Sequence, residues 1–262
     1  MMKKLGIYAG INYPIPIEER IAAIKSAGFD VICLDFEKDM ENTETSWENQ
    51  VNLANKYSLP ILEAHLTGSN MTSIWDENDS EEAKFVTQRL INELKDLSKL
   101  SIPTGIAHIT WGYKVPKPPS DKALNRFMRI TEAAEKYKVK LALENSVFEE
   151  QVRFVLGNIK SDYLGFCYDS GHENAFTPNA NYLDSFGARL FSMHLHDNNG
   201  IKDNHYPPFH KDGTVNWEKV AEKLKKTELF SKYVVIEAGK QEESFEKLLE
   251  ESYKAAVKLA NM

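Results

Sequence analysis

Short apolar runs alternate with longer amphipathic stretches along the whole 262-residue chain. The apolar runs show no regular apolar–polar alternation, which is typical of parallel strands that are buried on both faces. The longer stretches place apolar residues at helical spacing, most clearly over 81–100, where Leu90, Leu94 and Leu97 share one face. The pattern therefore predicts a chain in which strands and helices alternate.

Eight strands and eight helices follow from this pattern. The predicted strands cover 5–10, 29–37, 59–66, 104–111, 139–145, 163–169, 189–197 and 233–239. The predicted helices cover 17–28, 46–58, 81–100, 120–138, 147–158, 179–187, 215–229 and 242–260. Each strand–helix unit spans about 33 residues, the usual size of a βα unit.

The regular repeat favours one closed barrel. An open doubly wound sheet would normally carry a glycine-rich first turn for a nucleotide, and the turn after the first strand reads GINYPIP instead. No composition shift, linker or low-complexity tract marks a domain boundary. We therefore predict an α/β protein with one (β/α)8 TIM barrel domain over residues 1–262, and no nucleotide cofactor.

Composition restricts the compartment and the partners. The chain has 32 Lys and Arg against 39 Asp and Glu, a formal net charge of −7, and this acidic balance disfavours nucleic acids and anionic membranes as partners. No apolar run reaches the 18 residues of a transmembrane helix, and no apolar stretch follows the first lysines as in a signal peptide. Cys33 and Cys167 lie inside apolar runs, which argues against a disulfide framework. We expect a cytoplasmic protein with no membrane partner.

The histidines gather where a barrel places its active site. In such barrels the functional residues lie at the carboxyl ends of the strands and in the loops that follow. One histidine at a strand end is more often structural, but here every histidine falls at a strand end or in the next loop, and none lies in a predicted helix. They are His65, His108, His172, His194, His196, His205 and His210.

Three carboxylates also end predicted strands: Glu144, Asp169 and Glu237. Each follows four or more mostly apolar residues, so we expect them to be partly desolvated and to need a cation to offset their repulsion. With His194 they form a set of three oxygen ligands and one nitrogen ligand from four consecutive strands, which suits Mn²⁺, Mg²⁺, Co²⁺ or Zn²⁺. The alternative is that some of these acids pair with lysines across the top of the barrel.

These residues lie in motifs that resemble a known group over the whole chain. The motifs are LENS (143–146), CYDSGHEN (167–174), MHLHDNNG (193–200), DNHYPPFHKDGTVNW (203–217) and VVIEAG (234–239). They resemble the xylose isomerase-like TIM barrel superfamily, which contains sugar and sugar-phosphate isomerases and epimerases and also endonuclease IV-type apurinic-site nucleases. The resemblance assigns metal binding to Glu144, Asp169, His194 and Glu237. His196 is the weaker candidate on its strand, because the family pattern places the ligand two residues earlier.

The resemblance implies the isomerisation or epimerisation of a sugar ketose, free or phosphorylated, through a metal-stabilised enediolate. It makes Glu144 and Glu237 the acid–base pair, on opposite faces of the substrate. A metal-dependent dehydratase would share this chemistry. The resemblance also suggests substrate-binding roles for His65, His108, His172, Asp197 and Lys240. Dimers and tetramers are common in the superfamily, so a homo-oligomer is compatible with it.

The nuclease branch offers an alternative, because its three-zinc pattern matches nine residues of this chain. Beyond the four central ligands, it would make additional metal ligands of His65, His108, His172, Asp203 and His205. A protein that grips DNA needs several basic phosphate contacts. The predicted loops at the active-site end hold six lysines and no arginine against nine acids, which favours a small sugar substrate. A metal-holding barrel with only a binding role is the third interpretation.

Overall fold

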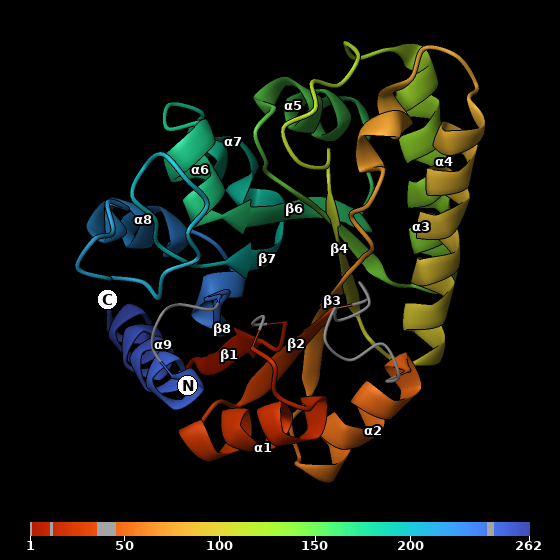
Figure 1. Ribbon diagram of the computed structural model, residues 1–262. Helices are drawn as coiled ribbons and strands as arrows, with labels where there is room; N and C mark the ends of the chain where they lie inside the picture. Colours follow the sequence, from red (N-terminus) through yellow and green to blue (C-terminus); the bar gives the residue numbers. More distant parts are fainter. Residues whose placement is uncertain (1, 11–12, 36–45, 240–243) are drawn as a thin grey trace.

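The computed structural model describes residues 2–10, 13–35, 46–239 and 244–262. Eight parallel strands form one sheet in the order β7-β6-β5-β4-β3-β2-β1-β8, and helices surround it (Figure 1). The two end strands close the ring through a parallel bridge between Leu195 and Ile236, where the Leu195 amide donates to the Val235 carbonyl at 3.1 Å. The predicted (β/α)8 TIM barrel is therefore confirmed.

The strands are short and evenly sized. They are β1 (Lys4–Tyr8), β2 (Val31–Asp35), β3 (Ile61–His65), β4 (Thr104–His108), β5 (Lys140–Glu144), β6 (Leu164–Asp169), β7 (Leu190–His194) and β8 (Tyr233–Ile236). The helices are α1 (Ile17–Ala27), α2 (Trp47–Lys56), η1 (Met71–Trp75), α3 (Glu81–Lys99), α4 (Asp121–Tyr137), α5 (Glu149–Asn158), α6 (Ser170–Phe176), α7 (Tyr182–Phe186), η2 (Gly187–Arg189), α8 (Trp217–Leu224), η3 (Leu229–Ser231) and α9 (Phe245–Asn261). Among the described helices, none combines the length and apolarity needed to cross a membrane.

The structure contains short helices that the sequence pattern did not predict, and α6 matters most. This helix begins directly after β6, where the Asp169 carboxylate caps it by accepting a hydrogen bond from the His172 amide at 2.6 Å. His172 therefore lies in a helix, contrary to the prediction that no histidine does. Seven residues are too few to show a helical period, so the capping carboxylate was the only local signal.

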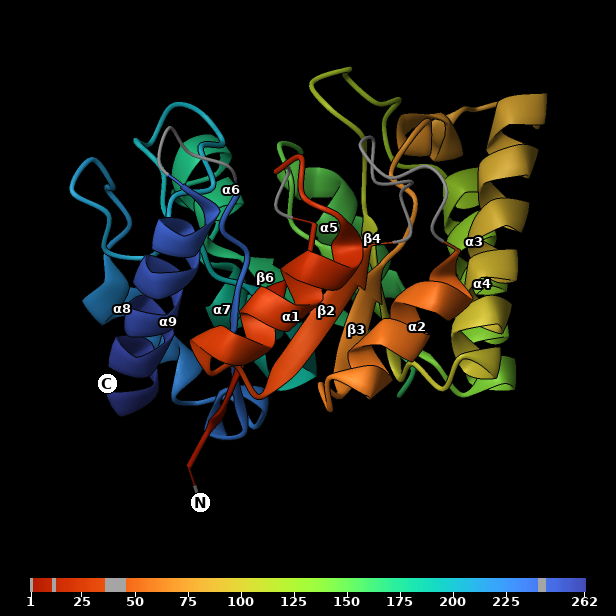
Figure 2. The ribbon, with the colours of Figure 1, turned by 60° about the horizontal axis from the view of Figure 1, so that its bottom comes forward.

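Alternation along the strands determines which side chains face the barrel interior. Successive side chains point to opposite faces of a strand, so residues two apart face the same way. The last inward layer is polar, and the apolar residues that face outward pack against the helices. That layer consists of Tyr8, Asp35, His65, His108, Glu144, Asp169, His194 and, after β8, Glu237. Figure 2 shows the barrel with its N-terminus at the bottom and the long loops at the opposite end.

Candidate metal centre and cavity

A cavity of about 660 Å³ opens among the residues that end the strands and the loops that follow them. Polar side chains from several strands form its floor, and Trp111 and Phe176 contribute apolar walls. Its polar lining includes Tyr8, Asp35, His65, His108, Glu144, His172, Asp203, His205 and Glu237. Most of the predicted site residues therefore line one cavity, as expected for residues at the carboxyl ends of barrel strands.

The four predicted metal ligands lie together at the centre of this end of the barrel. Glu144, Asp169, His194 and Glu237 each offer a ligand atom, and these atoms all lie within 4.8 Å of one another. His194 Nδ1 is 3.1 Å from Glu144 Oε1 and 3.1 Å from Glu237 Oε2. Three carboxylates and one imidazole in so small a volume form a donor set that suits a divalent cation.

The ionisation of the glutamates in this cluster also favours the binding of a cation. Burial alone would raise the pKa of Glu144 and of Glu237, but their histidine neighbours, His194 above all, together more than offset it. The pKa of Glu237 is lowered to about 2, and that of Glu144 lies well below its usual range. Both glutamates are therefore ionised at neutral pH. Glu237 Oε2 is buried and is not in a well-aligned hydrogen bond among the described residues, although His194 Nδ1 lies 3.1 Å away, so this oxygen can also act as a ligand of an ion.

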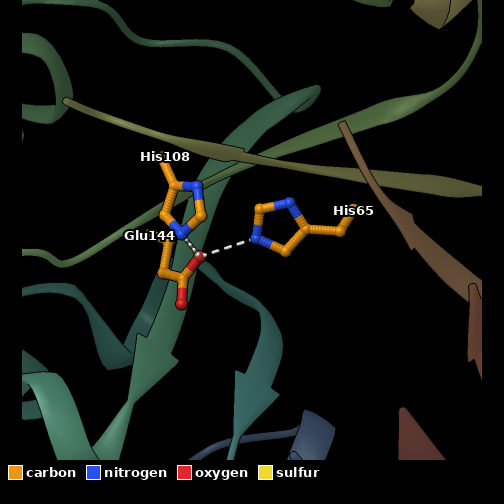
Figure 3. Close-up of side chains that lie close together, drawn as sticks. All are labelled: His65, His108 and Glu144. Atoms are coloured by element: carbon orange, nitrogen blue, oxygen red, sulfur yellow. Dashed lines mark hydrogen bonds and ion pairs between the residues drawn. The ribbon is translucent and has the colours of Figure 1, made fainter. Parts of the chain in front are cut away.

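The second carboxylate oxygen of Glu144 contacts two histidines, His65 and His108 (Figure 3). This Oε2 lies 3.0 Å from His65 Nε2 and 3.4 Å from His108 Nε2. Burial lowers the pKa of His65, but the hydrogen bond to Glu144 and the charge of Glu144 raise it overall to about 9. Burial lowers the pKa of His108 to about 3. In the metal-free protein at neutral pH, His65 is therefore charged and His108 is neutral.

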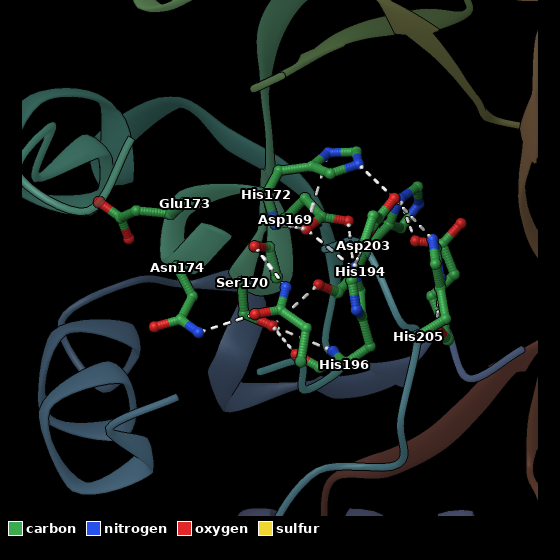
Figure 4. Close-up of polar contacts among 12 residues, drawn as sticks. Asp169, Ser170, His172, Glu173, Asn174, His194, His196, Asp203 and His205 are labelled. Carbon is green, nitrogen blue, oxygen red and sulfur yellow. Dashed lines mark hydrogen bonds and ion pairs between the residues drawn. The ribbon is translucent and has the colours of Figure 1, made fainter. Parts of the chain in front are cut away.

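A third cluster, formed by His172, Asp203 and His205, also lines the cavity (Figure 4). Asp203 Oδ2 is 3.2 Å from His172 Nε2 and 3.1 Å from His205 Nε2. Burial opposes protonation of His205, but Asp203 raises its pKa to about 10. His172 Nδ1 lies 2.8 Å from the Asn145 carbonyl oxygen, which orients the ring. The structure thus brings together the five residues that were predicted as additional metal ligands, in two groups.

Two candidates take other positions. His196 is fully buried, and its Nε2 lies 3.0 and 3.1 Å from the two carboxylate oxygens of Asp169, so it holds that carboxylate from behind. Asp197 does not line the cavity: it accepts from the Trp217 indole at 2.7 Å and the Val215 amide at 3.0 Å. In this structure the Asp197 carboxylate thus holds the loop after β7, and its predicted substrate contact stays a prediction.

His210, one of the seven histidines, does not line the cavity. His210 stacks on Tyr206 at 4.3 Å between ring centroids and lines a separate groove beside α9. Lys240, predicted as a substrate contact, lies outside the described residues.

Two acidic residues were missed by the sequence reasoning. Asp35 ends β2 and lines the cavity, so the rule that selected Glu144 would also have selected it. Glu63 lies two residues before His65 and is fully buried in the barrel interior. The alternation of β3 is the signal that could have found Glu63.

The fold and the site define the class of protein: an α/β barrel with a candidate metal site at the carboxyl ends of its strands. Within that class, residues 21–258 match the family described as xylose isomerase-like TIM barrel, and the chain belongs to this family.

Solved structures share the fold over nearly the whole chain. A D-tagatose 3-epimerase-like protein is 21% identical with a TM-score of 0.75, and 98% of each chain is covered. A protein named IOLI, described with a bound zinc atom, is 17% identical with a TM-score of 0.77 and the same coverage. A 3-keto-D-glucoside 4-epimerase from E. coli is 19% identical with a TM-score of 0.72, covering 99% of this chain and 100% of that one.

Two curated relatives match shorter parts of the chain, and both are uncharacterised. One, from Sinorhizobium fredii, is 41% identical over 68 residues, which are 26% of this chain and 21% of the relative. The other, from Methanocaldococcus jannaschii, is 32% identical over 116 residues, which are 40% of this chain and 39% of the relative. The matched parts thus span well under half of either relative.

Proposed function

We propose that the protein is a divalent-metal-dependent sugar isomerase or epimerase. The observation that carries this proposal is the cluster of Glu144, Asp169, His194 and Glu237, whose ligand atoms lie within 4.8 Å of one another. Glu144 and Glu237 of this cluster line the cavity. The similarity in fold to proteins described as sugar epimerases supports the substrate class. These four residues would hold the metal.

The metal, when bound, supplies a Lewis acid that stabilises negative charge on a sugar oxygen beside the carbon that loses its proton. Glu144 and Glu237 reach the cavity from different sides of the ring, one at the end of β5 and the other after β8. Both are ionised in the metal-free protein, so either carboxylate can accept the proton of the substrate. The other must first take up a proton from solvent, which it then delivers to the opposite face. His108 is neutral and borders the cavity, so its imidazole can donate a hydrogen bond to a sugar hydroxyl, as can that of His172.

Exchange of solvent deuterium into a panel of ketoses and ketose phosphates tests this proposal. The protein is loaded in turn with Mn²⁺, Mg²⁺, Co²⁺ or Zn²⁺, and incorporation beside the carbonyl is followed by NMR together with epimer formation. We expect exchange with at least one sugar and its loss in Glu144→Gln and Glu237→Gln. A protein that holds its metal but exchanges no hydrogen in any sugar would contradict the proposal.

A second candidate is a phosphodiester hydrolase of the endonuclease IV type. The specific observation in its favour is that two further groups of potential ligand atoms lie beside the central cluster and could hold further ions: His65, His108 and Glu144, and His196, Asp203 and His205. The described lining of the cavity has no lysine or arginine for DNA phosphates, which favours the sugar.

Metal content per chain and cleavage of apurinic-site DNA separate the two candidates. Asp203→Ala and His205→Ala would abolish a multi-zinc nuclease but only weaken a one-metal epimerase. Loss of water from a polyol-derived ketone, followed in the same sugar assay, would identify the related dehydratase instead.

A further inference from the structure

A buried carboxylate lies in the layer of side chains directly below the central cluster. Glu63 points into the barrel like His65, but one layer deeper, because the two residues are two apart on β3. It is fully buried, and its Oε1 accepts a hydrogen bond from the Cys33 thiol at 3.4 Å. Its Oε2 has no hydrogen-bond partner in the described part of the chain. Burying a carboxylate is unfavourable, so its position requires an explanation.

The imidazole of His194 connects this layer to the cluster above. Its Nδ1 faces the carboxylates of Glu144 and Glu237, both at 3.1 Å. Its Nε2 faces the other way, 3.8 Å from Glu63 Oε1. This Nε2 is also buried and has no hydrogen-bond partner among the residues described. A neutral imidazole carries one proton, so Nδ1 can act as a metal ligand only when the proton is on Nε2.

We propose that Glu63 is a positioning residue that keeps the His194 proton on Nε2 and so presents Nδ1 to the metal. The 3.8 Å separation in this structure is longer than a hydrogen bond, so this role requires the two side chains to approach to within about 3.2 Å when the metal binds. The thiols of Cys33 and Cys167 would be weaker hydrogen-bond acceptors for the Nε2 proton of His194 than the carboxylate of Glu63 is. A carboxylate behind a metal-binding imidazole orients the ring and raises its basicity. The inference rests on the proposed metal site and adds a residue that the acid–base chemistry does not use.

Metal binding to three variants tests this role. Glu63→Leu removes the acceptor, Glu63→Gln keeps an acceptor oxygen, and Glu93→Leu is the control, because Glu93 is a buried glutamate on α3, outside the barrel interior. The affinity of the metal-free protein for Mn²⁺ and Zn²⁺ is measured by calorimetry with a competing chelator. We expect the affinity to fall about 10- to 100-fold in Glu63→Leu, to stay within a few-fold of wild type in Glu63→Gln, and not to change in Glu93→Leu.

A second measurement reads the tautomer directly and does not depend on the fold of Glu63→Leu. Nitrogen-15 spectra of labelled histidines in the metal-loaded wild-type protein should show His194 protonated at Nε2. Protonation at Nδ1, or wild-type affinity in a folded Glu63→Leu variant, would overturn the proposal. An equal loss of metal affinity in Glu63→Gln and Glu63→Leu would also overturn it, because the contribution of Glu63 to metal affinity would then not come from a hydrogen-bond acceptor.

His194→Ala distinguishes failure of this inference from failure of the proposed function. If wild type binds metal and His194→Ala does not, the metal site stands, and the Glu63 variants alone decide the inference. If wild type binds no metal, both proposals fail.

Discussion

Replacing Glu144 by Gln should lower the pKa of His65 in the metal-free protein. The Glu144 carboxylate lies 3.0 Å from His65 Nε2, and its hydrogen bond and charge raise the pKa of His65 from 6.5 to about 9 against the opposing effect of burial. This rise of about 2.5 units corresponds to roughly 3 kcal/mol, at about 1.4 kcal/mol for each unit. In Glu144→Gln only burial and the other neighbours remain, so the pKa of His65 should fall below 6.5.

The same change should alter how stability depends on pH. A histidine whose folded-state pKa is raised contributes stability below pH 6.5 and loses it as the pH rises to about 9. The metal-free wild type should therefore lose free energy of unfolding across this window, and Glu144→Gln should lose less. NMR titration of the His65 ring and urea unfolding at several pH values measure both effects. Glu237→Gln is the matched control, because Glu237 is not among the main groups that shift the pKa of His65.

One result would refute the reasoning behind this prediction. If His65 still titrated near pH 9 in Glu144→Gln, the hydrogen bond and charge of Glu144 could not be the cause of its raised pKa.

Three further outcomes are expected. In metal-free Asp203→Asn, the pKa of His205 should fall from about 10, because its charged partner is lost; NMR titration measures this, and an unchanged value would contradict the assignment. Metal at about 100 times its Kd should stabilise the wild type by about 2.7 kcal/mol in thermal unfolding, an effect absent after chelation. Gly171→Ala should destabilise by about 1–3 kcal/mol, because the added Cβ would lie 2.0 Å from the His196 ring. Gly157→Ala is its control, since its Cβ meets nothing within 4 Å, and equal losses in the two variants would refute the steric cause.

Much of the candidate site could be predicted because two sequence patterns indicate where the strands lie and where they end. Unbroken apolar runs mark buried parallel strands, and the polar residue that ends such a run marks the active-site end of a barrel. Glu144 and Asp169 were found this way, and the structure places them within one cluster. Their roles as ligands and acid–base groups stay predictions until metal binding and exchange are measured.

Other features depend on contacts that no local pattern records. Helix α6 is too short to show a period, and it forms because Asp169 caps it. The carboxylate of Asp197, for which the resemblance suggests a substrate contact, accepts a hydrogen bond from the indole of Trp217, 20 residues further along the chain. A local sequence reading cannot identify such a distant partner.

The sequence alone determined the barrel, the polar end of each strand and the set of histidines and carboxylates available there. Only the tertiary structure decided how that set divides among the clusters. His194 and His196 are two residues apart, yet the first meets Glu144 and Glu237 while the second holds Asp169 from behind. The physical reason is the closure of the ring. It brings strand ends from distant parts of the chain within a few ångströms, so each pairing follows from the position of every strand around the barrel.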